Sequence, residues 1–193
     1  MKLAFSTNAY LKFSFAEAVA RLARIGYAGV EIMADVPHAW PAYLLEEQKQ
    51  AIRDALSRNN LRISNVNSFM MHAVNDPRQK YWHPSWIEPD PHYRQIRIDH
   101  TKRALTLARE LGAPCITTEP GGPVEKGASW SAALKQFVEG LKPVLEHAEK
   151  EGVLEAGAGN VLGQLIELVL LLALALDHVQ PAEPVFLASV CPQ

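Results

Sequence analysis

The sequence predicts an α/β fold with a mostly parallel sheet, and three observations support this prediction. Four short apolar runs, at residues 3–5, 29–30, 61–66 and 115–117, each end in a polar cluster. A segment with helical spacing follows each run, as expected for a chain of parallel βα units. The pattern then stops after Gly152, where a Leu- and Ala-rich stretch with few charges begins.

Apolar runs and helical spacing together give an ordered series of elements. Strands are predicted over residues 3–7, 29–33, 61–67, 114–118 and 152–154, and helices over 15–25, 41–58, 93–111 and 129–150. Ser14 is placed to cap the first helix, with Glu17 completing a capping box. Gly26 ends that helix and Gly112 the third, while Pro143 should kink or divide the fourth. Periodicity alone leaves an open sheet and part of a closed barrel as alternatives.

Composition limits the class of protein. A chain of 193 residues with 48% hydrophobic and 21% charged residues forms one domain, or two at most. Its net charge of −2 provides no basic field, so nucleic acid is not an expected partner. The apolar stretch at 168–176 is shorter than the roughly 20 residues of a membrane span. We predict a cytoplasmic protein without a membrane segment, in which Cys115 and Cys191 form no disulfide.

A long segment between Phe69 and His92 is rich in Pro, His, Trp and Asp and lacks periodicity. Loops of this length in a compact domain are often binding loops or lids. Trp82 and Trp86 either cover one face of a sugar ring or anchor the loop. His72, a few residues past the third strand, is either a metal ligand or a histidine that faces solvent or bonds to a neighbour.

Polar side chains follow the predicted strands at Asn8, Glu31, Asn67 and Glu119. Because the carboxyl ends of parallel strands lie at one edge of a sheet, we expect these side chains to meet. Two carboxylates and two amides can hold a divalent cation, or move a proton on a carbon next to a carbonyl. Alternatively, Glu31 pairs with a basic residue and the asparagines cap helices. Glu119 is the stronger functional candidate, because Pro-Gly-Gly follows it and lets the backbone approach a ligand.

Four segments carry a resemblance to a known family. They are residues 5–8 (Phe-Ser-Thr-Asn), 26–32 (Gly-Tyr-Ala-Gly-Val-Glu-Ile), 63–67 (Ile-Ser-Asn-Val-Asn) and 118–122 (Thr-Glu-Pro-Gly-Gly). Together they resemble the xylose isomerase-like TIM barrels, which include sugar (phosphate) isomerases and epimerases, inosose dehydratases and apurinic endonucleases. The resemblance covers residues 1–152. It implies parallel βα repeats of a TIM barrel, truncated after roughly four to five units.

The resemblance also implies an activity. The expected enzyme interconverts ketoses or epimers of a sugar or sugar phosphate through an enediolate, while a divalent metal (Mn, Mg, Co or Zn) stabilises the oxyanion. Glu31 matches the glutamate of the family's second strand. Glu119 and Asn67 stand where many relatives have histidine, which disfavours an endonuclease. The implied catalytic residues are Glu119 and Glu31, the substrate-binding residues are Asn8, Asn67, His72, Trp82 and Trp86, and the metal ligands are Glu155 and Glu119.

Residues 153–193 depart from the family pattern, and we expect a helix there at about 160–177. Glu155 is the residue placed to replace the family's fifth-strand metal ligand. If residues 156–159 were encoded GCC GGA GCC GGN, reading one nucleotide later would spell Pro-Glu-Pro-Gly, as in the family. We hypothesise a frameshift near residue 155, which sequencing the locus tests: an intact frame with no barrel-like coding sequence downstream would contradict it. The alternative is a non-catalytic half-barrel that forms a homo-oligomer through its apolar C-terminal helix.

Overall fold

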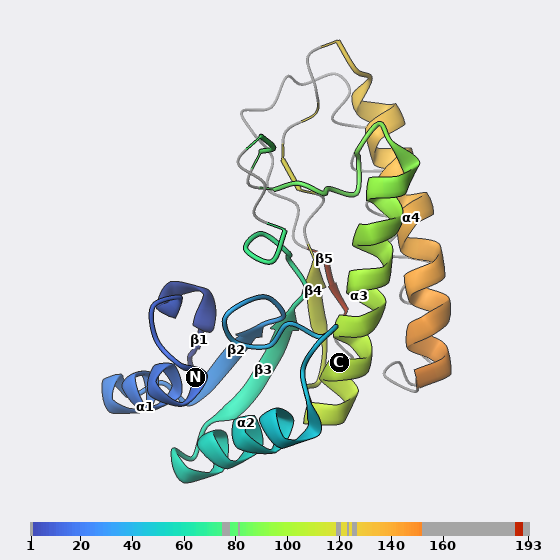
Figure 1. Ribbon diagram of the computed structural model, residues 1–193. Helices are drawn as coiled ribbons and strands as arrows, with labels where there is room; N and C mark the ends of the chain where they lie inside the picture. The colour runs from blue at the N-terminus through green and yellow to red at the C-terminus, as the bar shows by residue number, and fades with distance from the viewer. Residues whose placement is uncertain are drawn as a thin grey trace.

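The computed structural model describes residues 2–74, 78–80, 82–118, 121–122, 124, 127–151 and 188–190 (Figure 1). Its strands form one sheet in the order β1–β2–β3–β4–β5. The strands are β1 (Ala4–Ser6), β2 (Gly29–Met33), β3 (Arg62–Asn67), β4 (Ile116–Thr118) and β5 (Ala188–Val190). The first four run parallel, which confirms the predicted α/β fold, whereas β5 pairs antiparallel with β4.

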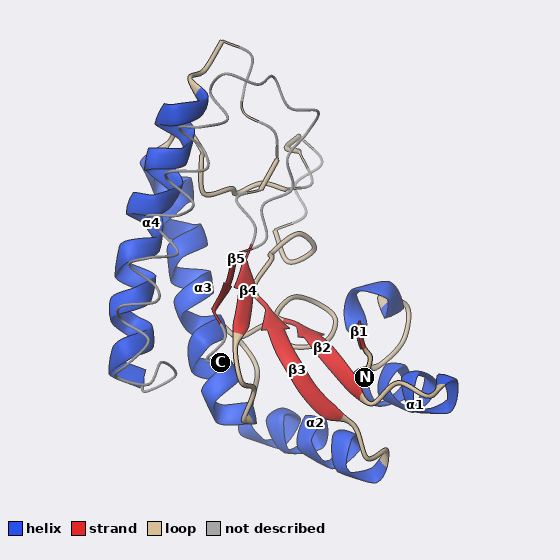
Figure 2. Cartoon of the chain, turned by 180° about the vertical axis from the view of Figure 1, so that it is seen from behind, coloured by secondary structure: helices blue, strands red, loops and turns tan. Residues whose placement is uncertain are grey.

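The helices connect the parallel strands in the predicted order. They are the 3-10 helix η1 (Thr7–Tyr10) and the α-helices α1 (Phe15–Ile25), α2 (Glu46–Arg58), α3 (Pro91–Leu111) and α4 (Trp130–Glu151). Figure 2 shows α3 and α4 side by side along one edge of the sheet, with α1 and α2 below it. The sheet curves as a segment of a barrel wall does, so its two faces have different surroundings.

Local signals place the ends of most helices as the sequence predicts. The Ser14 hydroxyl accepts a hydrogen bond from the Glu17 backbone N–H at 3.3 Å, as predicted. The Glu17 carboxylate pairs with Arg21 at 2.7 Å and does not complete the predicted capping box. Gly26 and Gly112 end α1 and α3 with φ of 101° and 71°, conformations that side-chain-bearing residues rarely adopt.

One expectation about helices is wrong, and one of two alternatives for another is excluded. The helix expected to open at Pro41 begins at Glu46, where the Gln48 side chain accepts from the Leu45 backbone N–H at 2.8 Å. Pro143 lies inside α4 without dividing it, which excludes division, and the kink stays a prediction. The strand predicted at 152–154 and the helix at 160–177 lie outside the described residues.

Side chains on the two faces of the sheet alternate as a barrel wall requires. Val30, Ile32, Val66 and Ile116 are buried at 1% exposure or less among core residues of α1 to α3. Strand register places Glu31, Asn65, Asn67 and Thr117 together on the opposite face. The helix-covered face therefore forms the apolar core, and the other face carries polar side chains.

Cys115 corrects a further expectation. It is disulfide-bonded, although the distance between the two cysteines in the sequence suggested otherwise. Sequence separation does not limit which residues meet in space, and disulfides are typical of oxidising compartments. In the described ranges, no helix is long and apolar enough to cross a membrane. The cytoplasmic location stays a prediction.

Candidate functional site

A polar network joins the carboxyl ends of β2, β3 and β4. The Asn65 side-chain amide donates to Glu31 Oε2 at 2.7 Å and to Thr117 Oγ1 at 3.0 Å. The Asn67 amide donates to Glu31 Oε1 at 3.4 Å. All four side chains are half-buried. The expectation that Glu31 and Asn67 meet is thus confirmed, and the carboxylate of Glu31 is oriented by one amide on each oxygen.

A β-bulge sets the alignment of this network. The register between β2 and β3 shifts between Val30 and Glu31, so that Val30 faces Ile63 but Glu31 faces Asn65. The extra residue, Ser64, has no partner across the strand pair, and its hydroxyl donates to Asn65 Oδ1 at 2.9 Å. Without the bulge Glu31 would face Ser64 and the amide would lie on the wrong face of the sheet.

Asp35 is a buried residue that the sequence analysis missed. Its carboxylate accepts four backbone N–H groups: Oδ1 from Val36 at 2.8 Å and Ala73 at 2.9 Å, and Oδ2 from Met71 at 2.7 Å and His72 at 2.6 Å. The side chain is fully buried, and these donors replace the water that an exposed carboxylate would bind. Asp35 thereby fixes the segment after β2 to the segment after β3.

The remaining predicted residues are placed as follows. Asn8 lies in η1, exposed at the end of β1, where its backbone N–H donates to Ser6 Oγ at 3.2 Å. The hydrogen bonds that join Glu31, Asn65, Asn67 and Thr117 do not include Asn8. His72 is half-buried, with its Nε2 lacking a hydrogen-bond partner among the described residues. Glu119 and Glu155 lie outside the described residues.

The tryptophans of the long loop have different surroundings. Trp86 is 1% exposed, donates its indole N–H to Thr118 Oγ1 at 3.0 Å and meets the Phe137 ring edge-on. This placement supports the loop-anchoring alternative for Trp86. Trp82 is half-buried, with the Lys80 ammonium 5.6 Å from its ring centre.

The glycines after β4 approach this loop. A Cβ on Gly121 would lie 2.9 Å from Ser85 Cβ, and one on Gly122 would overlap the Trp82 indole. Both residues have positive φ, so two independent constraints favour glycine here. The close backbone approach expected beside Glu119 is therefore made to the long loop.

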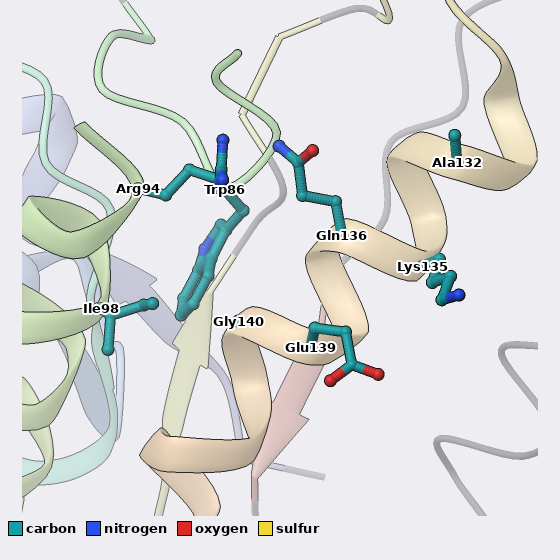
Figure 3. Close-up of a pocket in the computed structure, with 8 residues that line it drawn as sticks. All are labelled: Trp86, Arg94, Ile98, Ala132, Lys135, Gln136, Glu139 and Gly140. Atoms are coloured by element: carbon teal, nitrogen blue, oxygen red, sulfur yellow. The ribbon is translucent and has the colours of Figure 1, made fainter. Parts of the chain in front are cut away.

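Trp86 also forms part of a pocket of about 440 Å³ between α3 and α4 (Figure 3). Arg94 and Ile98 come from α3, and Gln136, Glu139 and Gly140 from α4. This pocket contains neither Glu31 nor its amide partners. It lies in the helix layer, apart from the polar face of the sheet.

His100 contacts the start of the segment after β3. Its ring stacks on Trp40 with centres 4.8 Å apart and hydrogen-bonds to the Ser68 backbone. Burial, with a further contribution from the Arg97 charge, lowers the pKa of His100 to about 3 despite that bond. Burial also lowers the pKa of His38. Both rings therefore favour the neutral form in the folded protein.

Parallel βα units whose polar strand ends meet at one edge define a TIM-barrel type of site. The chain belongs to one family of such barrels, the xylose isomerase-like TIM barrel family, whose model matches residues 19–165. No curated protein matches the sequence. The resemblance inferred from the sequence motifs is thus confirmed at the level of the family.

Solved structures of this fold include sugar epimerases. D-psicose 3-epimerase from Clostridium cellulolyticum H10, solved with D-tagatose, is 19% identical with a TM-score of 0.57, over 79% of this chain and 50% of that one. The 3-keto-D-glucoside 4-epimerase from E. coli is 14% identical, TM-score 0.54, over 79% and 53%. A Mycobacterium smegmatis protein solved with magnesium is 14% identical, TM-score 0.54, over 78% and 52%. The chain thus spans about half the length of these proteins.

The Asp35 hydrogen bonds give a stability prediction. Asp35→Asn replaces one acceptor oxygen by a donor that faces backbone N–H groups, so the free energy of unfolding should fall by roughly 2–4 kcal/mol. Urea denaturation measures this change in the free energy of unfolding. The control is Asp54→Asn on the exposed side of α2, which should change the free energy by less than about 0.5 kcal/mol. Equal effects of both substitutions would contradict the assigned role.

His100 gives a pH prediction. Because its pKa of about 3 in the folded state lies below the value of 6.5 expected when unfolded, the unfolded chain binds more protons between these values. Stability should therefore fall as the pH drops from 6.5 towards 3, by up to about 1.4 kcal/mol per pH unit for this group. Denaturation across this range should show a shallower pH dependence for His100→Phe but not for exposed His92→Gln. Identical slopes for wild type and His100→Phe would refute the assignment.

Proposed function

We propose that this chain carries half of the site of a sugar isomerase or epimerase, with Glu31 as a proton-transfer group. The observation that carries the proposal is the Glu31 carboxylate, oriented by Asn65 and Asn67 at the carboxyl ends of the strands. In a TIM barrel, this edge is where catalytic side chains gather. Membership of the xylose isomerase-like family and the sugar epimerases among the fold's solved structures support a sugar or sugar phosphate as substrate.

The proposed chemistry is proton transfer at a carbon next to a carbonyl. Glu31 would accept that proton, leaving an enediolate. Return of a proton to the neighbouring carbon then gives the isomer. Return of a proton to the opposite face of the original carbon gives the epimer. The Asn65 and Asn67 amides hold the carboxylate in one orientation, so little reorganisation is needed when the substrate binds. Glu119 is proposed as the second carboxylate.

A divalent metal, when bound, would stabilise the negative charge of the enediolate oxygen. Within the described ranges, no three His, Cys, Asp or Glu side chains form a group that could hold a metal ion. Glu31 is the carboxylate that the described part of the network offers, and the proposed ligands Glu119 and Glu155 lie outside it. The described residues therefore do not form a metal site by themselves. Proton removal requires Glu31 and its amide partners, and proton return to the other face requires the proposed second carboxylate, Glu119.

Comparison of two chain lengths tests the proposal and the frameshift hypothesis together. If the reading frame near residue 155 is restored, the long form should bind a divalent metal and interconvert ketohexoses such as D-tagatose. The present chain should show much less of both, because it spans about half the length of the solved epimerases. Metal analysis and chromatography of the sugars measure the outcome. A long form that binds metal without any turnover would argue against the isomerase proposal.

Substitution of Glu31 tests its role in whichever form is active. Glu31→Gln keeps the shape and hydrogen-bonding groups but cannot accept the proton, so kcat should fall at least about 100-fold. Glu47→Gln, at an exposed position in α2, should leave kcat unchanged. Exchange of the substrate C–H proton with deuterated water should fall in parallel. Retained exchange in Glu31→Gln would assign the proton transfer to another residue.

Exposed apolar side chains favour an oligomeric half-barrel as a second candidate. Leu3 and Phe5, in and beside β1, are 57% and 41% exposed, and Ile25, at the end of α1, is 65% exposed. A sheet edge with apolar neighbours is a common contact surface. Light scattering should then give about twice the 21.4 kDa of one chain. Ile25→Glu should shift the mass to a monomer, whereas Tyr43→Glu, at another exposed position, should not; a monomeric wild type would rule out this candidate.

A further inference from the structure

A second pair of titratable side chains lies in the long loop, apart from Glu31. His83 Nδ1 is 2.8 Å from Glu88 Oε1, and that oxygen also accepts from the Ser85 backbone N–H at 3.2 Å. His83 is 8% exposed, and its ring meets Tyr93 edge-on with centres 4.4 Å apart. The imidazole is therefore fixed in position by a carboxylate on one side and an aromatic ring on the other.

This arrangement determines which ring nitrogen of neutral His83 carries the proton. A carboxylate accepts hydrogen bonds, so Nδ1 donates its hydrogen to Glu88 and Nε2 keeps its lone pair. Among the described residues, the ring hydrogen bond of His83 is the one made by Nδ1, and Nε2 makes none. His83 therefore presents a hydrogen-bond acceptor that the protein does not use.

His83 and Glu88 line a pocket of about 320 Å³, which is within the size range of small-molecule sites. Its lining residues come from the long loop and from the start of α4. Both segments lie beyond the end of the sheet where the parallel strands finish (Figure 1). The pocket wall includes Trp82. This tryptophan lies against Gly122, in the segment that follows β4. The pocket thus belongs to the same edge of the sheet as Glu31.

The lining combines groups that suit a polyhydroxylated ligand. Trp82 offers an aromatic surface, His83 an acceptor and Ser129 a hydroxyl. Gln136 donates its amide N–H to the Glu88 backbone carbonyl at 2.9 Å, which leaves its carbonyl oxygen as a further acceptor. The lining also includes the cationic side chains of Arg78 and Lys80. An aromatic face beside acceptor and cationic groups matches the C–H face and the hydroxyl groups of a sugar.

We propose that this pocket binds a sugar, and that one of its hydroxyl groups donates a hydrogen bond to His83 Nε2. Glu88 is the positioning residue, because it holds the proton on Nδ1 and leaves Nε2 free to accept. The inference rests on the proposed function for the identity of the ligand as a sugar. It does not require turnover, so binding can be tested separately from catalysis.

Histidine NMR on the full chain, labelled with ¹⁵N at its imidazole rings, provides the test. D-tagatose added to saturation should shift the Nε2 signal of His83 and leave Nδ1 protonated. His147 supplies a matched internal control, since it also lies near a glutamate, with Nε2 3.7 Å from Glu151, but does not line this pocket. Its signals should not move.

Two substitutions extend the test. His83→Leu should weaken D-tagatose binding at least tenfold, and His147→Leu should leave it unchanged. Glu88→Leu should weaken binding as well and let the proton of His83 distribute over both nitrogens, which a merely structural role would not predict. If His83→Leu fails to fold, the wild-type titration decides alone.

The outcomes separate this inference from the proposed function. Sugar-dependent shifts at His83, together with a frame-restored form that does not exchange the substrate C–H proton, would support the pocket and contradict the isomerase. Turnover with unchanged His83 signals would support the isomerase and overturn the pocket. Unchanged signals together with wild-type affinity in His83→Leu would show that the pair only stabilises the loop.

Discussion

The rest of the site depends on one buried carboxylate. Asp35 follows β2, and three of its four donors, the backbone N–H groups of Met71, His72 and Ala73, follow β3. A buried carboxylate without such donors would cost several kcal/mol, so the two segments are held in one arrangement. The polar strand ends beneath them therefore keep a fixed geometry.

The polar face of the sheet depends on a second constraint, the bulge in β3. Parallel register alone would place Ser64 opposite Glu31, whereas the extra residue brings Asn65 there. Asn65 then contacts both Glu31 and Thr117, which joins three strands by side chains as well as by backbone bonds. A carboxylate supported in this way keeps its orientation even where the face is open to solvent.

Sequence reasoning succeeded where the determinants are local. Ser14 and Gly26 bound α1 because caps depend on residues within one turn, and strand-end topology correctly brought Glu31 near Asn67. Reasoning of this kind missed Asp35, whose donors at 71–73 lie 36 to 38 positions away. Pro41 misled because α2 begins later, at Glu46, where the Gln48 side chain accepts a hydrogen bond from the Leu45 backbone N–H. Asn65 was missed because its position opposite Glu31 depends on the bulge, which no local pattern shows.

The end of β4 joins these constraints to the long loop. Thr118 accepts the Trp86 indole hydrogen, while Gly121 and Gly122 allow the backbone to contact Ser85 and Trp82. The segment that carries His83 and Glu88 is therefore attached to β4. In the same strand, Thr117 accepts a hydrogen bond from Asn65. Because Asn65 also orients Glu31, the proposed sugar pocket and the proposed proton-transfer group share one continuous set of contacts. The edge that carries both proposed groups is thus ordered by contacts that lie within β2 to β4 and their loops.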